Sequence, residues 1–356
     1  MNPAYDAVLA SDADARAGLF TTTAQRLGTT PQNVEKDFWV CWTLDALFNG
    51  REGGPRLLFK GGTSLSKGFG LIDRFSEDVD VTVFRDDLGQ GHSLEELAAL
   101  SRKKRDAALD AIKAACEAYI NGDLLARLTA IAAETADRTG LPAGELAVRP
   151  HDEDRQTLLV QYASVTPADG YIDKVVKIES GAKSALDPHS ERTISPYVAP
   201  DAPGLDLEVP NVTIVDAERT FWDKVAILHG LRRWFEIRGE LRGGGHRISR
   251  HYYDLHKLLA SEAGEAALAD PALGTDCVAH ARMFFNRPDN DLTSAQAPTF
   301  VLTPQGAMRD ALRRDYQAMA GMIFGEAPAF DAILDSVATL EQRVNASTPT
   351  EGPVSE

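Results

Sequence analysis

The sequence has little cysteine and no long apolar run. Its three cysteines, Cys41, Cys116 and Cys277, are widely separated and form no Cys-x-x-Cys pair, which argues against a structural zinc site or a disulfide framework. No apolar run approaches the roughly 20 residues that a membrane span needs. The N-terminal stretch also has no basic region followed by an apolar one, as a signal peptide would. We therefore expect a cytoplasmic protein with no membrane partner.

Positive charge is also scarce. Lys and Arg number 37 against 53 Asp and Glu, and the formal net charge is −16. This balance argues against non-specific nucleic-acid binding through the whole surface, although a local basic patch is compatible with it. The most cationic segment is residues 232–250, which also holds Trp234 and Phe235. Two interpretations stay open for it. One is a solvated helix end and loop, and the other is a phosphate-contacting surface, with Arg238, Arg242, Arg247 and Arg250 as RNA contacts.

Motifs for hydrolytic or metal-histidine chemistry are missing as well. His229, His246 and His251 show no metal-ligand spacing, and no Gly-x-Ser-x-Gly elbow supports a Ser-His-Asp arrangement. The sequence therefore argues against a hydrolase.

One stretch carries most of the chemical information, namely residues 59–84, FKGGTSLSKGFGLIDRFSEDVDVTVF. Asp78 and Asp80 lie one residue apart in a run of valines. Residues i and i+2 of a strand share a face, so the valines predict the core face and the two aspartates the opposite one. Neighbouring carboxylates repel unless a cation lies between them. We therefore expect Asp78 and Asp80 to hold Mg²⁺ (or Mn²⁺) against the phosphates of a nucleotide.

A Gly-Gly-Thr turn precedes this strand. Gly61 and Gly62 have no side chain, so their backbone N–H groups can approach a phosphate closely. Thr63 and Ser64 add hydroxyl groups at the start of a predicted short helix, where the helix dipole favours anions. A plain β-turn is the alternative, and the two aspartates downstream favour the phosphate site.

The pattern of elements predicts an α+β fold with a mixed sheet of about four or five strands. Helices are expected at residues 31–49, 93–119, 123–138, 216–235, 249–259, 304–324 and 328–344. Strands are expected at 57–59, 78–84, 157–163 and 171–179, the last two joined through 167–170, and 184–211 is expected to be a long loop. The predicted organisation is a first domain over residues 1–240 with a helical insertion at 93–140, a helical region over 241–345, and a disordered tail at 346–356.

GGTSLSK followed by RFSEDVD resembles the signature of the DNA polymerase β-like nucleotidyltransferases. Within that superfamily the chain is most similar to the AbiEii/AbiGii toxin family. Three later segments resemble the same family: VVKIESGAKS, ERTFWDKVAILH and RHYYDLHKL. The likeness extends over residues 31–259, and the glycine turn with its Asp-x-Asp pair is its most specific part.

The resemblance implies roles for further residues. Arg74 and Ser76 match the run that lines the nucleotide pocket of the family. Such enzymes add a third carboxylate from a neighbouring strand, for which Glu179 is the candidate, and Lys177 would neutralise charge developing on the phosphoryl group. A cross-strand ion pair of these two residues is the alternative. The family also implies an acid–lysine pair on a later helix, which Asp223 and Lys224 match, although a plain surface helix explains their placement too.

The function implied is transfer of a nucleoside monophosphate from an NTP to an acceptor hydroxyl, with release of pyrophosphate. The resemblance implies that the acceptor is the 3′ end of a tRNA and that the protein acts as a growth-arresting or phage-defence toxin. A cognate antitoxin is the expected partner. A small-molecule adenylyltransferase and a non-catalytic NTP-binding sensor are the alternatives. The acidic surface suits a cationic small substrate, whereas the cationic segment and the intact Asp78 and Asp80 favour the transferase.

Overall fold

The computed structural model describes residues 1–167 and 174–346. The predicted turn at residues 167–170, the first residues of the strand predicted at 171–179, and almost all of the predicted tail lie outside the described residues. The chain forms two compact units, Met1–Val215 and Asp216–Glu356. The division precedes the helix α8 (Ala217–Arg238), whereas the sequence placed a boundary after it. Each unit is described by itself.

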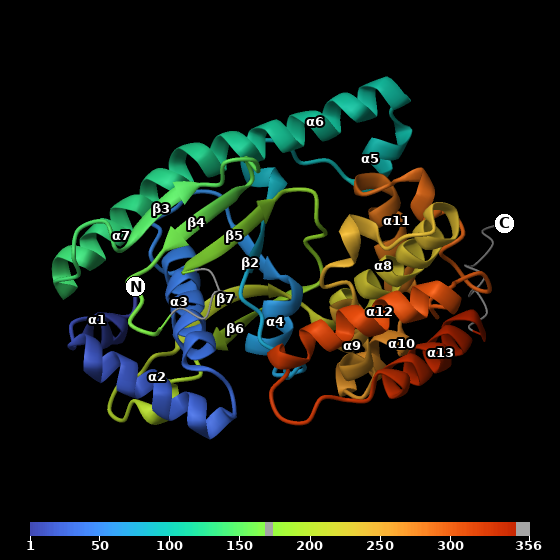
Figure 1. Cartoon of the computed structure of the whole chain (residues 1–356). Helices are drawn as coiled ribbons and strands as arrows, with labels where there is room; N and C mark the ends of the chain where they lie inside the picture. Colours follow the sequence, from blue (N-terminus) through green and yellow to red (C-terminus); the bar gives the residue numbers. More distant parts are fainter. Residues whose placement is uncertain (168–173, 347–356) are drawn as a thin grey trace. The chain divides into compact units, whose positions relative to one another are not determined.

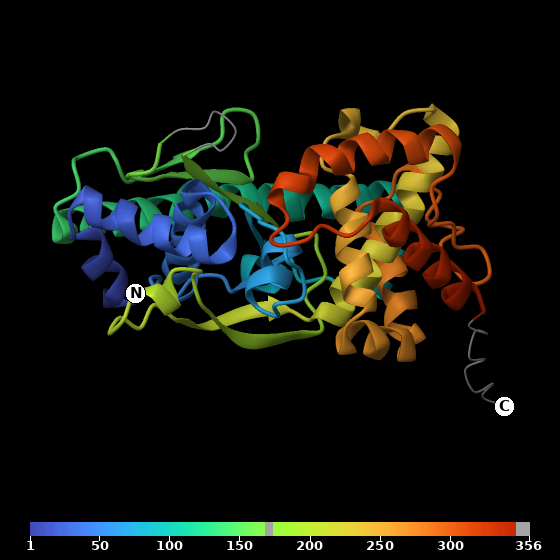
Figure 2. The same cartoon turned by 60° about the horizontal axis from the view of Figure 1, so that its bottom comes forward.

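The first unit is a sheet with helices packed on it (Figures 1 and 2). Its strands are β1 (Leu57–Lys60), β2 (Val79–Val83), β3 (Ala147–Pro150), β4 (Thr157–Gln161), β5 (Val175–Gly181), β6 (His189–Ile194) and β7 (Val209–Val215). Its helices are α1 (Pro3–Leu9), α2 (Ala13–Leu27), α3 (Pro31–Phe48), α4 (Gly61–Lys67), α5 (Leu94–Ala99), α6 (Arg102–Tyr119) and α7 (Leu125–Thr139). A π-helical turn (Ile120–Leu124) joins α6 to α7, so the two run as one long helical rod in Figure 1.

The described strands form a seven-stranded mixed sheet in the order β3-β4-β5-β2-β1-β7-β6. β2 is antiparallel to β1 and parallel to β5, and β7 is parallel to β1. The predicted α+β class and mixed sheet are therefore confirmed, whereas the predicted number of strands, four or five, is too low. The predicted loop over residues 184–211 is wrong in part, because β6 and the start of β7 lie in it. Frequent proline and aspartate hide these strands from a propensity argument.

The core of this unit lies on the valine face of β2. Val79, Val81 and Val83 are fully buried, as the alternation predicted. Helix α3 covers this face and contacts β2, β5 and β7. It starts at Pro31 after the capping hydroxyl of Thr30, as the sequence predicted. Its Trp39 stacks on Tyr162, which follows β4, with ring centroids 5.3 Å apart.

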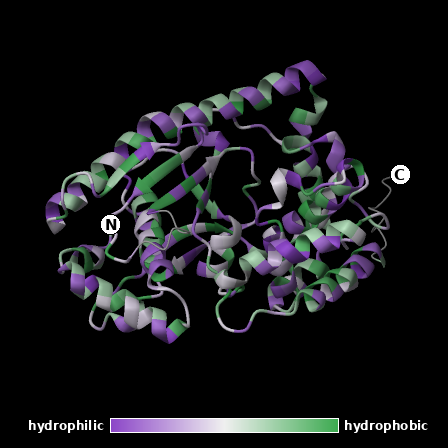
Figure 3. Ribbon diagram, in the orientation of Figure 1, coloured by the Kyte–Doolittle hydropathy of each residue, from purple (hydrophilic) through white to green (hydrophobic). Residues whose placement is uncertain are grey.

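The predicted helical segment after β2 is confirmed. Ser93 and Glu96 form a reciprocal capping box at the start of α5. In Figure 3, α6 and α7 alternate between hydrophobic and hydrophilic colours, as expected of helices that bury one side. Their buried residues include Ile112, Cys116 and Leu128. None of the helices in the described part of the chain has both the length and the apolar character that a membrane crossing requires.

The described residues of the second unit form helices joined by loops. It contains α8, α9 (Ser249–Leu259), α10 (Glu262–Ala269), α11 (Pro271–Phe284), α12 (Gly306–Met319) and α13 (Phe330–Ala346). Helix α8 packs against α9, α10 and α11, and α9 packs against α12 and α13. Phe221, Val225 and Leu228 form the buried stripe of α8 that the sequence predicted. Helices α10 and α11 were not predicted, because the apolar residues of α10 are mostly alanine and those of α11 show weak helical periodicity.

Candidate active site

The two aspartates lie where the chain enters β2. Asp78 directly precedes the strand, Asp80 is its second residue, and both side chains are partly exposed while the valines between and after them are buried. Asp80 also lies beside Lys60 of β1, with the Lys60 Nζ 3.9 Å from its Oδ1. The alternation therefore holds the two carboxylates on the face opposite the core.

The glycine turn touches these acids directly. Gly61 has φ +81°, and a Cβ on it would lie 2.1 Å from Oδ2 of Asp80. A Cβ on Gly62 would lie 2.3 Å from Nη2 of Arg74 and 3.3 Å from Oγ of Ser76. Only glycine fits at either position without displacing a polar side chain. The turn thus brings backbone, an acid and a guanidinium within contact of one another.

Hydroxyl groups fix the turn to the strand entry. Thr63 Oγ1 donates to the carbonyl of Asp78 at 2.5 Å and lies 2.8 Å from Oγ of Ser76. Ser64 Oγ donates to the carbonyl of Gly61 at 2.8 Å. The hydroxyl groups of Thr63 and Ser64 therefore donate their hydrogens to other protein atoms. The groups that would bind a phosphate are backbone N–H groups and the guanidinium of Arg74, which is 4% exposed.

Strand β5 brings two further predicted residues to the same place. In the parallel pairing of β2 with β5, Asp80 lies opposite Glu179 and Val79 opposite Ile178. Residues opposite each other in a sheet point to the same face, so Glu179 joins Asp80 while Ile178 joins the core. Lys177, two residues earlier, lies close enough for its charge to act on Asp78. Strand β5 thus places Glu179 and Lys177 beside the two aspartates, and their roles in metal binding and catalysis stay predictions.

The electrostatics of this group favour a cation. Burial, with the nearby charges of Glu77 and Asp80, raises the pKa of Asp78, and the charges of Lys36 and Lys177 oppose the rise. Within the described residues, no three His, Cys, Asp or Glu side chains are gathered tightly enough to ligate a metal by themselves. Mg²⁺ commonly takes only one or two protein carboxylates, with water and substrate phosphates completing its shell. Asp78 and Asp80 fit that mode.

A buried ion pair lies beneath the far end of α4. Lys67 forms a salt bridge with Asp37 of α3, and the two side chains are 4% and 2% exposed. The Lys67 Nζ also lies 3.3 Å from the ring centroid of Tyr197, whose backbone N–H donates to Asp37 at 2.6 Å. Lys36 of α3 pairs with Glu77 at 2.7 Å, next to Asp78. The bridge from Lys67 to Asp37 thereby binds α4, whose first residues form the glycine turn, to the core helix α3.

Asp223 and Lys224 on α8 diverge from each other. Lys224 forms a buried salt bridge with Asp254 of α9 at 2.8 Å, with side chains 7% and 0% exposed. Asp223 is more exposed and lies 3.7 Å from Nε of Arg219. Consecutive helix residues point about 100° apart, so the two cannot share one partner easily. Their catalytic role stays a prediction.

Arginines of residues 232–250 pair with an acid of the same segment, Glu236, and with an acid distant in the sequence, Asp289. Arg232 and Arg233 pair with Glu236 at 3.0 Å, and Arg238 pairs with Asp289 at 2.5 Å. The predicted RNA contacts Arg242, Arg247 and Arg250 are all partly buried. Burial, with the nearby charge of Arg287, lowers the pKa of Arg242, whose guanidinium lies 6.0 Å from the Trp234 ring. Much of the positive charge of this segment is therefore compensated.

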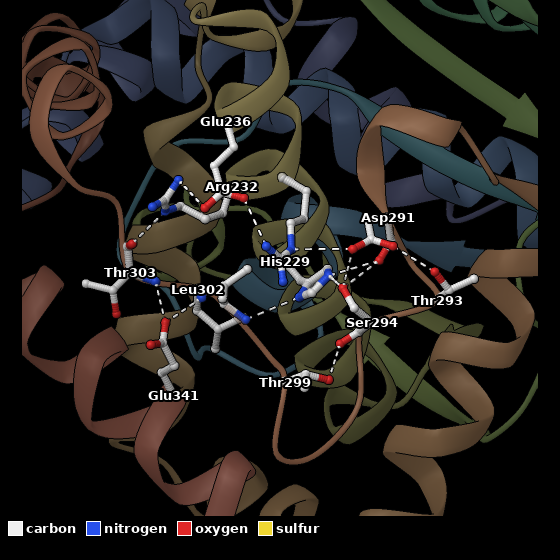
Figure 4. Close-up of polar contacts among 12 residues, drawn as sticks. His229, Arg232, Glu236, Asp291, Thr293, Ser294, Thr299, Leu302, Thr303 and Glu341 are labelled. Carbon is white, nitrogen blue, oxygen red and sulfur yellow. Dashed lines mark hydrogen bonds and ion pairs between the residues drawn. The ribbon is translucent and has the colours of Figure 1, made fainter.

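His229 organises a polar network in this second unit (Figure 4). Its Nδ1 accepts from the N–H of Val301 at 3.2 Å, so its Nε2 carries the proton toward the carbonyl of Asp291 at 3.1 Å. Nearby, the N–H groups of Leu302 and Thr303 donate to Glu341. His229 is fully buried, and this burial lowers its pKa. It thus holds a loop in place as a neutral ring.

Comparison with known proteins identifies the family. The model of the family "Nucleotidyl transferase AbiEii toxin, Type IV TA system" matches residues 42–336, which is most of the chain. The chain belongs to the AbiEii family. It is a nucleotidyltransferase. The family implies an NTP substrate and an antitoxin as partner, and nucleotidyltransferases generally use a divalent metal.

A solved structure is also similar to this AbiEii protein. It is the nucleotidyltransferase toxin MenT4 from Mycobacterium tuberculosis, with 17% identity over 91% of this chain and 99% of that chain and a TM-score of 0.37. Comparison with curated proteins gives no match.

Sequence reasoning missed the charged residues of α3 that support the AbiEii site. Glu35, Lys36 and Asp37 are consecutive, and all are at most 2% exposed. Glu35 accepts from the N–H of Val165 at 2.6 Å, while the other two pair as described above. The available signal was three charged residues between Val34 and Phe38 in an otherwise apolar helix, since buried charges require partners.

Proposed function

We propose that this AbiEii protein uses Mg²⁺ to transfer a nucleoside monophosphate from an NTP to the 3′ end of a tRNA. The supporting observation is the contact between the turn and the acids, in which Gly61 lies against the carboxylate of Asp80. A phosphate on the turn would lie next to the carboxylates, and only a cation between them would relieve the repulsion.

The proposed reaction forms one bond and breaks one. The acceptor oxygen bonds to the α-phosphorus, the bond from that phosphorus to the bridging oxygen breaks, pyrophosphate leaves and the acceptor proton is released to solvent. Bound Mg²⁺ would supply charge stabilisation for this displacement. Asp78 and Asp80 would hold it, with Glu179 beside them as the candidate third acid.

Other side chains of the site bind and orient the nucleotide in this proposal. Arg74, next to Gly62, would contact the phosphate through its guanidinium. Ser76, which is hydrogen-bonded to Thr63, would help to orient the phosphate. Lys177 would offset negative charge near Asp78. Because translation requires tRNA, its modification would explain a growth-arresting or phage-defence role. A cognate antitoxin would counteract that effect.

Incubation with each labelled NTP and total tRNA, with Mg²⁺ or with a chelator, tests the proposal. Label should appear on tRNA with at least one NTP, and removal of its 3′ nucleotide should remove the label. Chelation should abolish the transfer. Transfer of label only to small cationic compounds would instead support a small-molecule adenylyltransferase, which the net charge of −16 suits. Mg²⁺-dependent NTP binding without transfer to any acceptor would support a sensor.

A further inference from the structure

The first turn of α6 carries four consecutive cations, Arg102, Lys103, Lys104 and Arg105. The first three are exposed, and Arg105 is partly buried. Figure 3 shows the beginning of this helix in the hydrophilic colour. The turn is the densest run of positive charge in a chain whose formal net charge is −16.

These cations lie at the end of the helix where they are least favourable. A helix N-terminus carries partial positive charge, so acids stabilise it and cations destabilise it. The neighbouring helix α5 follows this rule, with Glu95 and Glu96 in its first turn and a complete capping box. In contrast, α6 has no acid in its first turn, and Ser101 forms no capping bond through its side chain. Helix stability therefore does not explain the charges.

Ion pairing does not explain them either. Arg102 lies 3.9 Å from Asp106, but the two side chains are 90% and 60% exposed, and such pairs contribute little. Within residues 1–167 and 174–346, Lys103, Lys104 and Arg105 form no hydrogen bond through a side chain and no salt bridge. The arginines near α8 differ, because Arg232 and Arg238 have carboxylates within 3.0 Å.

We propose that the first turn of α6 binds the phosphate backbone of the RNA acceptor. The inference rests on the proposed function, in which that acceptor is a tRNA. Closely spaced, hydrated and unpaired cations suit a chain of phosphates, because each contact releases counterions and requires no base-specific geometry. Polyanion charge would also compensate the unfavourable interaction of these residues with the helix dipole.

The test replaces Arg102, Lys103 and Lys104 with Gln in the full chain. Affinity for total tRNA should fall about tenfold or more at low salt, and the slope of log K against log salt should flatten by about two. The melting temperature should stay unchanged or rise, because the variant removes cations from a helix N-terminus. A residue with only a structural role would lower it.

The matched control replaces Lys113, Arg149 and Arg155 with Gln. It removes the same charge from the same unit, and all three of these side chains have a carboxylate within 4.0 Å, whereas of the three residues in the test variant only Arg102 has one among the described residues. Its tRNA affinity should remain within about twofold of the wild type. An equal loss in both variants would overturn the proposal, since it would show a general charge effect.

The remaining outcomes separate this inference from the proposed function. If the wild type labels tRNA and the α6 variant binds tRNA as tightly at every salt concentration, only the inference fails. If the wild type does not label tRNA, the proposed function fails and takes the inference with it. If the variant loses binding of poly-glutamate but not of tRNA, the surface recognises an acidic protein and the proposal is overturned.

Discussion

The sheet face around Asp80 and the helix α8 both carry acids and lysines, but the sheet gathers several acids together whereas α8 forms a closed ion pair. On the sheet, Asp78, Asp80 and Glu179 lie together, and burial with neighbouring acids raises the pKa of Asp78. On α8, Lys224 pairs with a buried carboxylate, that of Asp254. On the sheet the acids are gathered with Lys60 and Lys177 nearby, an open group that can take a cation from outside the protein, whereas the pair on α8 is closed. A cluster of acids is therefore the better guide to the site than a single buried pair.

The largest expected effect comes from Asp80→Asn. Loss of one ligand charge should reduce nucleotidyl transfer on the order of 10³-fold with the fold retained, because the cation that would offset the phosphate charge loses one of its two proposed carboxylate ligands. The measurement is the initial rate of NMP transfer, with melting temperature alongside. Asp87→Asn is the control, since Asp87 follows β2 and pairs with the exposed Arg56. If Asp80→Asn transfers NMP at nearly the wild-type rate, this face of the sheet is not the site of the reaction.

Lys224→Met should act on stability instead. It leaves Asp254 buried without its ammonium partner, and breaking a buried pair in this way costs about 3–5 kcal/mol of unfolding free energy. Urea denaturation of the second unit within the full chain measures it. The double variant Lys224→Met with Asp254→Leu should recover most of the loss. If Lys224→Met unfolds like the wild type and abolishes transfer, Lys224 belongs to the catalytic group after all.

Gly61→Ala should weaken NTP binding about tenfold or more. Its methyl group would overlap the Asp80 carboxylate, and its φ of +81° strains any L side chain. Gly70→Ala is the control, because Gly70 also has a positive φ, +63°, but open space around a Cβ. Gly70→Ala should lose about 1 kcal/mol of stability and Gly61→Ala at least as much, but only Gly61→Ala should lose nucleotide affinity in a thermal-shift titration. If the two variants bind NTP equally well, the turn only connects β1 to α4 and does not bind the nucleotide.

The smallest expected effect is the pH dependence due to His229. Its pKa is lowered in the folded state, so its contribution to stability is complete above the unfolded value near 6.5 and is lost as pH falls toward the folded value. The unfolding free energy should then fall by up to about 1.4 kcal/mol per pH unit. His229→Gln should flatten this slope in denaturation between about pH 7 and 5. An unchanged slope would assign the pH dependence to other groups.

Local patterns predicted the parts of the site that are close in sequence. Alternation of Asp and Val gave β2 its two faces, and the cap at Thr30 gave α3 its start. Ion pairs between residues distant in the chain could not be predicted from the sequence. No residue near Lys224 indicates Asp254 as its partner, and none near Lys67 indicates Asp37. The Gly61–Asp80 contact also required the fold, since β1 and β2 had first to be paired in register.

The order of strands in the sheet differs from their order of synthesis. β1 lies between β2 and β7, and β2 lies between β1 and β5, so the strands beside the glycine turn and the aspartates are made long before their outer neighbours. A nascent chain that ends before β5 has Asp80 without Glu179, and β1 and β2 are its exposed sheet edges. Such edges invite pairing with other chains. The emerging protein therefore depends on β5 and β7 to cover these two edges against aggregation on the ribosome, and on β5 to bring Glu179 beside Asp80.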